Sequence, residues 1–302
     1  MIVRPRPRAW ELFGIFRLSI VPKILPQVLG IAVFSLLIAG LGYRFPGALR
    51  TLNVAPFTLL GIALSIFLGF RNNVSYDRWW EARRQLGALI GDVRSLARLL
   101  MALPGGDRDR RERMVRKVIA YVYALMAHLR SQPMPAEVLL YDPAAEFTPQ
   151  SHNVPDALLR GLAGELAAML QAGEIGELLF AHLDDRLVAM SSVQVACERI
   201  KGTPAPFTYT LLLHRTAYAF CFMLPFGLVG TLGFATPIFC AVVAYAFFGL
   251  DELGSELEEP FGDWINSLPL SSMARTVEIS LLEALGETNL PEPLAPVDSI
   301  LT

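Results

Sequence analysis

The 302-residue sequence is poor in charge and lacks the compact motifs of enzymes and nucleotide-binding proteins. Asp, Glu, Lys and Arg make up 18% of it, against about 25% in soluble domains. No GxSxG, Walker A, GxGxxG or HExxH pattern occurs. The run HLDDR, from His182 to Arg186, is predicted to be a solvated helix face in preference to a metal or acid–base site. The sequence therefore predicts no catalytic residue and no enzyme.

Cysteine is also scarce, and its spacing excludes the common metal and redox motifs. Cys197, Cys221 and Cys240 are too far apart for a CxxC pair or a zinc-ligand spacing, so they are predicted to be small packing residues. The net charge is −2, and no basic run is interleaved with aromatic residues. We expect no metal, no cofactor and no nucleic-acid partner.

Strand patterns and a secretion signal are missing as well. Alternating β-branched or aromatic runs bounded by turn pairs do not occur, which predicts an all-α fold. The N-terminal arginines Arg4, Arg6 and Arg8 are not followed directly by an apolar region with a small-residue cleavage site. We expect this segment to be retained and cytoplasmic.

Long apolar runs are what the sequence has in abundance. Hydrophobic residues make up 53% of the chain, and the mean hydropathy is +0.44. A helix needs about 20 mostly apolar residues to cross a bilayer. Four windows meet or approach that length, which predicts an integral membrane protein with four transmembrane helices: Ile24 to Tyr43, Val54 to Phe70, Phe207 to Val229 and Leu232 to Leu250.

The third window differs from the others because it contains two basic residues, His214 and Arg215. Facing lipid, they would cost several kcal/mol, so we expect them to face protein, water or the membrane interface. Pairing with an acid or snorkelling near the cytoplasmic end is favoured over lining a pore.

The distribution of basic residues predicts the orientation and the domains. Arginine and lysine collect before the first window and after the second, whereas the loop at Gly230 and Thr231 carries no charge. Because cytoplasmic loops retain Lys and Arg, both termini are predicted to be cytoplasmic. The predicted order is a cytoplasmic N-terminal segment, two spans, a cytoplasmic helical domain, two further spans, and an acidic segment with an extended tail: 1–23, 24–70, 71–206, 207–250 and 251–302.

The segment 71–206 keeps helical periodicity although it is charged. Apolar residues recur at three- and four-residue spacing and end at the turn that begins with Pro104; they are Leu86, Leu89, Ile90, Val93, Leu96 and Leu100. A second helix is predicted from about Asp109 to Arg130, then a loop from Tyr141 to Pro155, with helices resuming near Asp156 and Glu174. The proline-rich C-terminal tail is expected to be extended or disordered.

The second window carries a repeated apolar spacing. Ile62, Ile66 and Phe70 are four residues apart and fall close to one helix stripe. If copies of this helix surround an axis, the stripe forms stacked apolar rings that gate by dewetting. From the pattern alone, lipid or a neighbouring helix is the favoured surrounding.

Polar and acidic runs follow the second and fourth windows. Arg71, Asn72 and Asn73 place donors where the helix leaves the membrane, either to coordinate ions or to bind headgroups and loops. The acidic run from Asp251 to Asp263 is typical of a solvated face. It could alternatively line a cytoplasmic entrance, attract cations, or pair with the basic run from Arg71 to Arg84.

Three stretches together resemble the bestrophin family, and in particular its bacterial branch. They are GFRNNVSYDRWWEARR, PFTYTLLLHRTAYAFCFMLPFGLVG, and the acidic stretch through EEPFG and NSLPL. With their order and the four windows, they cover nearly the whole chain. The RWW triplet and the later PFG are specific as a pair.

The resemblance implies a homopentamer in the bacterial inner membrane, with a central pore for small monovalent ions. The neck would be Ile62, Ile66 and Phe70, which reverses the earlier preference for lipid. The resemblance also implies a second, cytoplasmic constriction, for which Phe180 is our candidate.

One departure from the family concerns calcium. Calcium-activated members have a dense acidic cluster directly after PFG, where this chain has Asp263, Trp264, Ile265 and Asn266. We therefore expect no calcium gating by that route.

The ion is left between two choices. The acidic run and the net charge favour cations such as sodium, and chloride or another anion is the alternative. A non-conducting membrane scaffold or sensor is the rival class of function, and an enzyme with an intramembrane His/Arg site is a more distant one.

Overall fold

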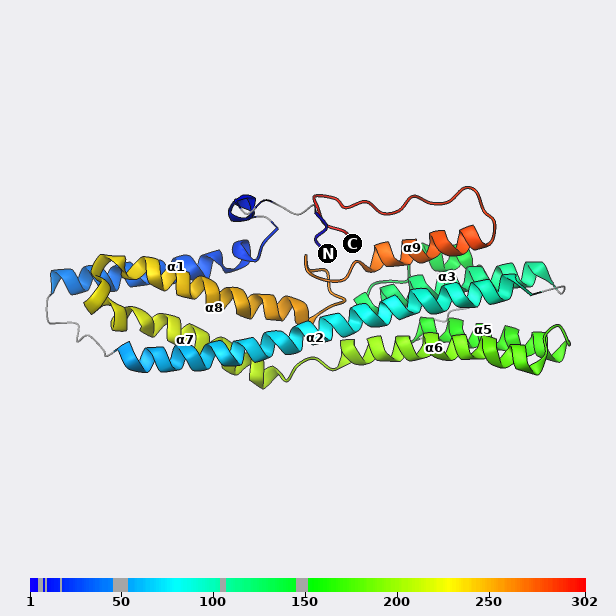
Figure 1. The fold of residues 1–302 in the computed structure, drawn as a ribbon, viewed down its shortest axis with the longest axis horizontal. Helices are drawn as coiled ribbons and strands as arrows, with labels where there is room; N and C mark the ends of the chain where they lie inside the picture. The colour runs from blue at the N-terminus through cyan, green and yellow to red at the C-terminus, as the bar shows by residue number, and fades with distance from the viewer. Residues whose placement is uncertain (5–7, 9, 17, 46–53, 104–106, 145–151) are drawn as a thin grey trace. The chain divides into compact units, whose positions relative to one another are not determined.

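The structure is a computed structural model that describes residues 1–4, 8, 10–16, 18–45, 54–103, 107–144 and 152–302. The described residues form helices and no named strand, with only the isolated bridges Ile2–Ile300 and Val297–Ile300. The all-α prediction is thus confirmed for this part of the chain (Figure 1). In chain order the elements are η1 (Glu11–Gly14), α1 (Val21–Arg44), α2 (Val54–Met101), α3 (Arg108–Arg130), α4 (Ala136–Tyr141), α5 (Val154–Gln171), α6 (Glu177–Gly202), α7 (Phe207–Leu232), η2 (Gly233–Ala235), α8 (Thr236–Glu258) and α9 (Leu270–Ala284).

The chain divides into two compact units. The membrane unit comprises Arg4–Trp79 and Pro204–Glu259, and the helical unit comprises Met1–Val3, Trp80–Thr203 and Pro260–Thr302. Helix α2 belongs to both, because its first half lies in the membrane unit and its second half in the helical unit.

Three helical stretches are long and apolar enough to cross a membrane. They are Val21–Arg44, Ala55–Met101 and Phe207–Glu258. The last contains both α7 and α8, which the short helix η2 joins. The four predicted windows fall in α1, the first part of α2, α7 and α8.

Helix α2 does not end at Phe70, where the predicted second span ends, but continues as one helix to Met101. The sequence between Phe70 and Met101 contains no proline, so every residue there has the backbone N–H that an uninterrupted helix needs. The apolar face predicted in this half is confirmed, because five of its residues are at most 1% exposed: Leu86, Leu89, Val93, Leu96 and Leu100. The predicted turn at 104–106 lies outside the described residues.

Four helices build the core of the membrane unit. Figure 1 shows α1 beside α8, and α7 beside the first half of α2. The buried cluster draws large apolar side chains from each helix, including Ile31 of α1, Leu68 of α2, Phe220 of α7 and Phe248 of α8. Cys221 and Cys240 are buried in the same cluster, as predicted for packing residues.

Close approach between α2 and α7 depends on glycine. A Cβ built on Gly227 of α7 would lie 2.8 Å from ring carbons of Phe57, and one on Gly61 of α2 would lie 3.2 Å from the ring of Phe220. Helices in membranes commonly use small residues to bring their backbones together. The two glycines therefore set how closely these helices pack.

The helical unit is organised around α3. Its N-terminus is capped by Asp107, whose side chain accepts from the Arg110 N–H, and its C-cap is Ser131, which has the left-handed conformation. Helices α4, α5, α6 and α9 all contact α3, and Val115, Val118 and Tyr121 on it are fully buried. The predicted second helix, Asp109 to Arg130, is thus confirmed to within one residue.

The C-terminal tail after α9 is extended, which is one of the two forms that its composition predicted. Residues Met1 and Val3 pair with it: the Val3 N–H donates to the Ser299 carbonyl at 2.8 Å, and the Leu301 N–H to the Met1 carbonyl at 2.8 Å. The Ser272 N–H of α9 donates to the Thr302 carbonyl at 2.7 Å. Backbone hydrogen bonds thus hold the tail in the helical unit.

Gly227→Ala is expected to destabilise the membrane unit, because the new methyl group would overlap the Phe57 ring. Overpacking of this kind costs about 1–3 kcal/mol. Thermal unfolding of the detergent-purified protein measures the effect. Gly30→Ala in α1 is the control, since no atom lies within 4 Å of its added Cβ, and its stability should be unchanged or higher. Equal destabilisation by both substitutions would contradict the proposed role of Gly227.

Candidate functional site

The predicted neck residues lie on a face of α2 that the membrane unit does not cover. Ile62, Ile66 and Phe70 are 55%, 51% and 58% exposed, whereas Leu64 and Leu68 are at most 2% exposed. The first three form one stripe along the helix, and the last two point into the core. No described residue covers this stripe, so its surroundings in a membrane are lipid or other protein.

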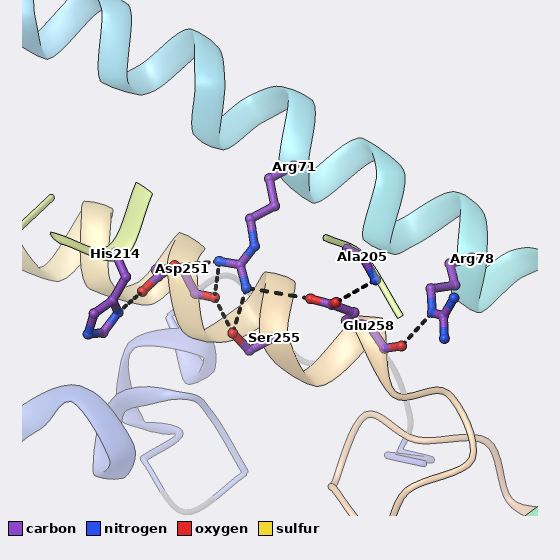
Figure 2. A network of polar contacts seen from close by, with 7 residues as sticks. All are labelled: Arg71, Arg78, Ala205, His214, Asp251, Ser255 and Glu258. Atoms are coloured by element: carbon purple, nitrogen blue, oxygen red, sulfur yellow. Dashed lines mark hydrogen bonds and ion pairs between the residues drawn. The ribbon is translucent and has the colours of Figure 1, made fainter. Parts of the chain in front are cut away.

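The residue directly after the stripe is anchored in the opposite direction. Arg71 is only 2% exposed, and its guanidinium points from α2 toward α8 (Figure 2). Its Nη1 pairs with Asp251 Oδ1 and lies 3.2 Å from the Asp251 carbonyl, and its Nη2 donates to Ser255 Oγ at 2.8 Å. The Glu258 Oε2 atom lies 3.7 Å from Nη2. The fork of the guanidinium thus holds α2 against α8.

His214 joins α7 to the same carboxylate. Its Nδ1 atom lies 2.7 Å from Asp251 Oδ2, so the two oxygens of Asp251 serve Arg71 and His214 separately (Figure 2). The prediction that this histidine pairs with an acid is confirmed. Arg215, its neighbour in sequence, is exposed.

Glu258 closes the network at the end of α8. Its Oε1 accepts from the Ala205 N–H at 2.9 Å, and its carbonyl accepts from Arg78 Nε at 2.7 Å (Figure 2). Lys23 of α1 lies 3.0 Å from Glu252 and 2.8 Å from Glu256. Acids on α8 therefore meet basic groups from α1, α2 and α7.

These contacts decide between the alternatives for the acidic run. Asp251 and Glu258 pair with the beginning of the basic run, at Arg71, while Glu252 and Glu256 pair with Lys23. Four of the six acids of the run therefore contact Arg71 or Lys23, but these two basic groups each serve two of them, so only part of the negative charge is balanced by these contacts. The solvated-face interpretation fails for Asp251 and Glu256, which are 6% and 2% exposed.

Small residues on α8 make room for the network. A Cβ on Gly254 would collide with Asn72 Oδ1, and it would lie 3.7 Å from Arg71 Cζ. Neither Gly254 nor Ser255 was identified from the sequence. A signal was available, because Asp251, Ser255 and Glu258 recur at helical spacing and therefore share one face of α8.

The three residues predicted at the neck exit separate in the structure. Arg71 is buried, Asn72 is half-buried against α8, and Asn73 is exposed. Of the three, therefore, only Asn73 is exposed, as Ile62, Ile66 and Phe70 are. Phe180, the candidate for the second constriction, lies half-buried in the first turn of α6 in the helical unit.

Within the described part of the chain, no group of three His, Cys, Asp or Glu side chains is arranged to hold a metal ion. Asp263, which follows PFG, lies 3.4 Å from Arg130. The arrangement is thus one of long apolar helices, a buried ion-pair network and an uncovered apolar stripe, which defines an all-α membrane protein.

Comparisons with known proteins identify its family. The model of the bacterial and fungal bestrophin proteins matches residues 1–283. Voltage-dependent anion channel-forming protein mll4386 of Mesorhizobium japonicum is 44% identical over 299 residues, covering 99% of this chain and 96% of the relative. Voltage-dependent anion channel-forming protein YneE of Escherichia coli is 40% identical over 306 residues, covering 98% of each chain.

Solved structures agree with this result. A crystal structure of a variant bestrophin homologue from Klebsiella pneumoniae is 36% identical, with a TM-score of 0.81, and the match covers 88% of this chain and all of that one. The chain belongs to the bestrophin family. It has the all-α bestrophin fold and is a channel-forming membrane protein, not an enzyme.

Arg71→Gln is expected to lower the free energy of unfolding by about 3–5 kcal/mol, because it leaves the buried Asp251 carboxylate without its cationic partner. Thermal unfolding in detergent measures this loss. Arg84→Gln removes the same charge from an exposed pair with Glu81, and it should cost no more than about 1 kcal/mol. If Arg71→Gln is as mild as Arg84→Gln, the network does not hold the helices together.

Proposed function

We propose that copies of this chain assemble around a central pore, in a homopentamer whose neck is formed by Ile62, Ile66 and Phe70. The observation that carries the proposal is the division of α2 into two faces. Leu64, Leu68 and Arg71 fix one side to the membrane unit, while the neck stripe lies uncovered on another. In an oligomer, the stripes of all copies would face one central axis. Their side chains would form stacked apolar rings, and such rings can close the pore to ions by dewetting.

We propose further that the pore conducts small monovalent anions such as chloride. Both curated relatives described above are named as anion channel-forming proteins. The sequence favoured cations such as sodium because of the acidic run and the net charge of −2, but four of the six acids in that run contact Arg71 or Lys23, which reduces the charge available to a passing cation. The neck itself carries no charge, so selectivity must arise elsewhere along the path.

One observation favours cations as the second candidate. Asp77 is exposed on α2, seven residues, or about two turns, beyond Phe70. In an oligomer its copies would form a ring of carboxylates below the neck, and such rings are typical of cation channels. The two candidates therefore differ in whether the ring of Asp77 carboxylates or another part of the path sets the ion selectivity.

The remaining parts of the proposal concern topology. The chain would cross the bacterial inner membrane four times, with α1, the first part of α2, α7 and α8 as the spans. Because basic flanking residues are retained on the cytoplasmic side, both termini would lie in the cytoplasm. Asn73 would lie at the neck exit. Phe180 would form the second constriction in the cytoplasmic part of the pore.

The ion is decided by the reversal potential of the purified protein in planar bilayers under a salt gradient. We expect a reversal potential close to the equilibrium potential of chloride. A reversal potential close to the equilibrium potential of the cation would reject the anion proposal. If the Asp77→Asn variant then lost this cation selectivity, the selectivity would be assigned to the ring of Asp77 carboxylates. Absence of any current would favour the scaffold.

Ile66→Ala is expected to raise single-channel conductance, because a smaller side chain widens the apolar neck and makes it easier to wet. The matched control is Phe67→Ala. Phe67 is the next residue on the same helix and is similarly exposed, at 50%, but it points about 100° away from the stripe. Conductance that is unchanged in Ile66→Ala, or raised equally in both variants, would contradict the assignment of the neck.

A further inference from the structure

Three buried polar atoms on one turn of α2 have no hydrogen-bond partner within the described part of the chain. They are Arg71 Nε, Asn72 Oδ1 and Ser75 Oγ. Ser75 is only 1% exposed, and its hydroxyl does not bond to the carbonyl one turn earlier, as serine hydroxyls in helices often do. Buried polar atoms are nearly always bonded to protein or to ordered water, because an unpaired one loses its hydration without compensation. The three atoms therefore point to a ligand.

The three side chains occupy neighbouring positions on the face of α2 that meets α8. A helix turns by about 100° per residue, so Ser75 lies about 40° around the axis from Arg71, between Arg71 and Asn72. Both neighbours reach α8: the Arg71 guanidinium bonds to it through Nη1 and Nη2, and Asn72 Oδ1 lies against Gly254. The Ser75 hydroxyl is therefore buried in the same seam between α2 and α8.

An acid of α8 in this seam is too far from Arg71 for a direct hydrogen bond. Glu258 Oε2 lies 3.7 Å from Arg71 Nη2, whereas an N–H···O bond is usually about 2.7–3.2 Å long (Figure 2). The Arg71 Nε atom belongs to the same guanidinium fork and has no acceptor. A polar separation of this size is commonly bridged by a water molecule.

The chemistry of the seam selects water over an ion. Arg71 Nε can only donate, Asn72 Oδ1 and the Glu258 carboxylate can only accept, and the Ser75 hydroxyl can do both. A cation would face the N–H and the positive charge of the guanidinium. An anion would face a carboxylate and an amide oxygen. Water accepts on one side and donates on the other, so it satisfies both kinds of group.

We propose that the seam between α2 and α8 binds an ordered water molecule. It accepts a hydrogen bond from Arg71 Nε, bonds to Ser75 Oγ, and donates to Asn72 Oδ1 or Glu258 Oε2. The water extends the ion-pair network along α2 by one turn beyond Arg71. The site lies within one membrane unit, so it depends neither on the number of copies nor on the ion that the pore conducts.

A crystal structure of the full-length protein, at a resolution that shows ordered water, tests the site directly. We expect a density peak about 3 Å from both Arg71 Nε and Ser75 Oγ. Crystals grown with rubidium in place of sodium, and with bromide in place of chloride, identify the ligand, because both ions scatter anomalously. No density at the site, or an anomalous peak there, would overturn the proposal.

Ser75→Ala tests the site in solution, because a bridged hydroxyl and an unpaired one predict opposite signs. Removing a hydroxyl that bonds to the water is expected to lower the melting temperature in detergent by about 2–4 °C. Removing an unpaired buried hydroxyl would raise it.

The matched control is Ser95→Ala, on the same helix. The Ser95 hydroxyl is accessible to solvent and donates to the Gly91 carbonyl at 2.8 Å, so this substitution reports the change in helix preference alone. Its melting temperature should be unchanged or slightly higher. A melting temperature of Ser75→Ala that equals or exceeds that of Ser95→Ala would contradict the water site.

Discussion

The buried guanidinium of Arg71 is the constraint on which the membrane unit depends. A charge in this position is tolerable only when its partners surround it, and Asp251, Ser255 and Glu258 of α8 provide them. The same carboxylate of Asp251 reaches His214 of α7. One ion-pair network therefore fixes three helices directly beside Phe70, the last residue of the exposed apolar stripe on α2.

This anchoring explains how α2 can hold one apolar face in a fixed direction although no other part of the membrane unit packs on that face. Glycine at 227 and 254 lets neighbouring helices approach α2 closely, and the network fixes its rotation about its own axis. Ile62, Ile66 and Phe70 are then held on an uncovered side. A stripe that lines a pore needs such fixation, because rotation of α2 would replace it with Leu64 and Leu68.

Much of the fold follows from local patterns in the sequence. Apolar length predicted the membrane-crossing helices, and three- and four-residue spacing predicted the buried face from Leu86 to Leu100. The change from apolar to charged residues after Phe70 predicts where a membrane span ends, and the helical periodicity of the next segment was also predicted. That the two form one helix was not, because an uninterrupted helix depends on backbone hydrogen bonds and not on polarity.

The sequence by itself determined that this is an all-α membrane protein and that Ile62, Ile66 and Phe70 share one stripe of α2, because hydropathy and helical spacing are local properties. It left His214 either to pair with an acid or to snorkel. Only the tertiary structure decided which acid pairs with His214 and that Arg71 turns away from the stripe. Residues 71 and 251 are 180 positions apart, and such pairing depends on how separate helices pack and rotate. No spacing within a single helix encodes that choice.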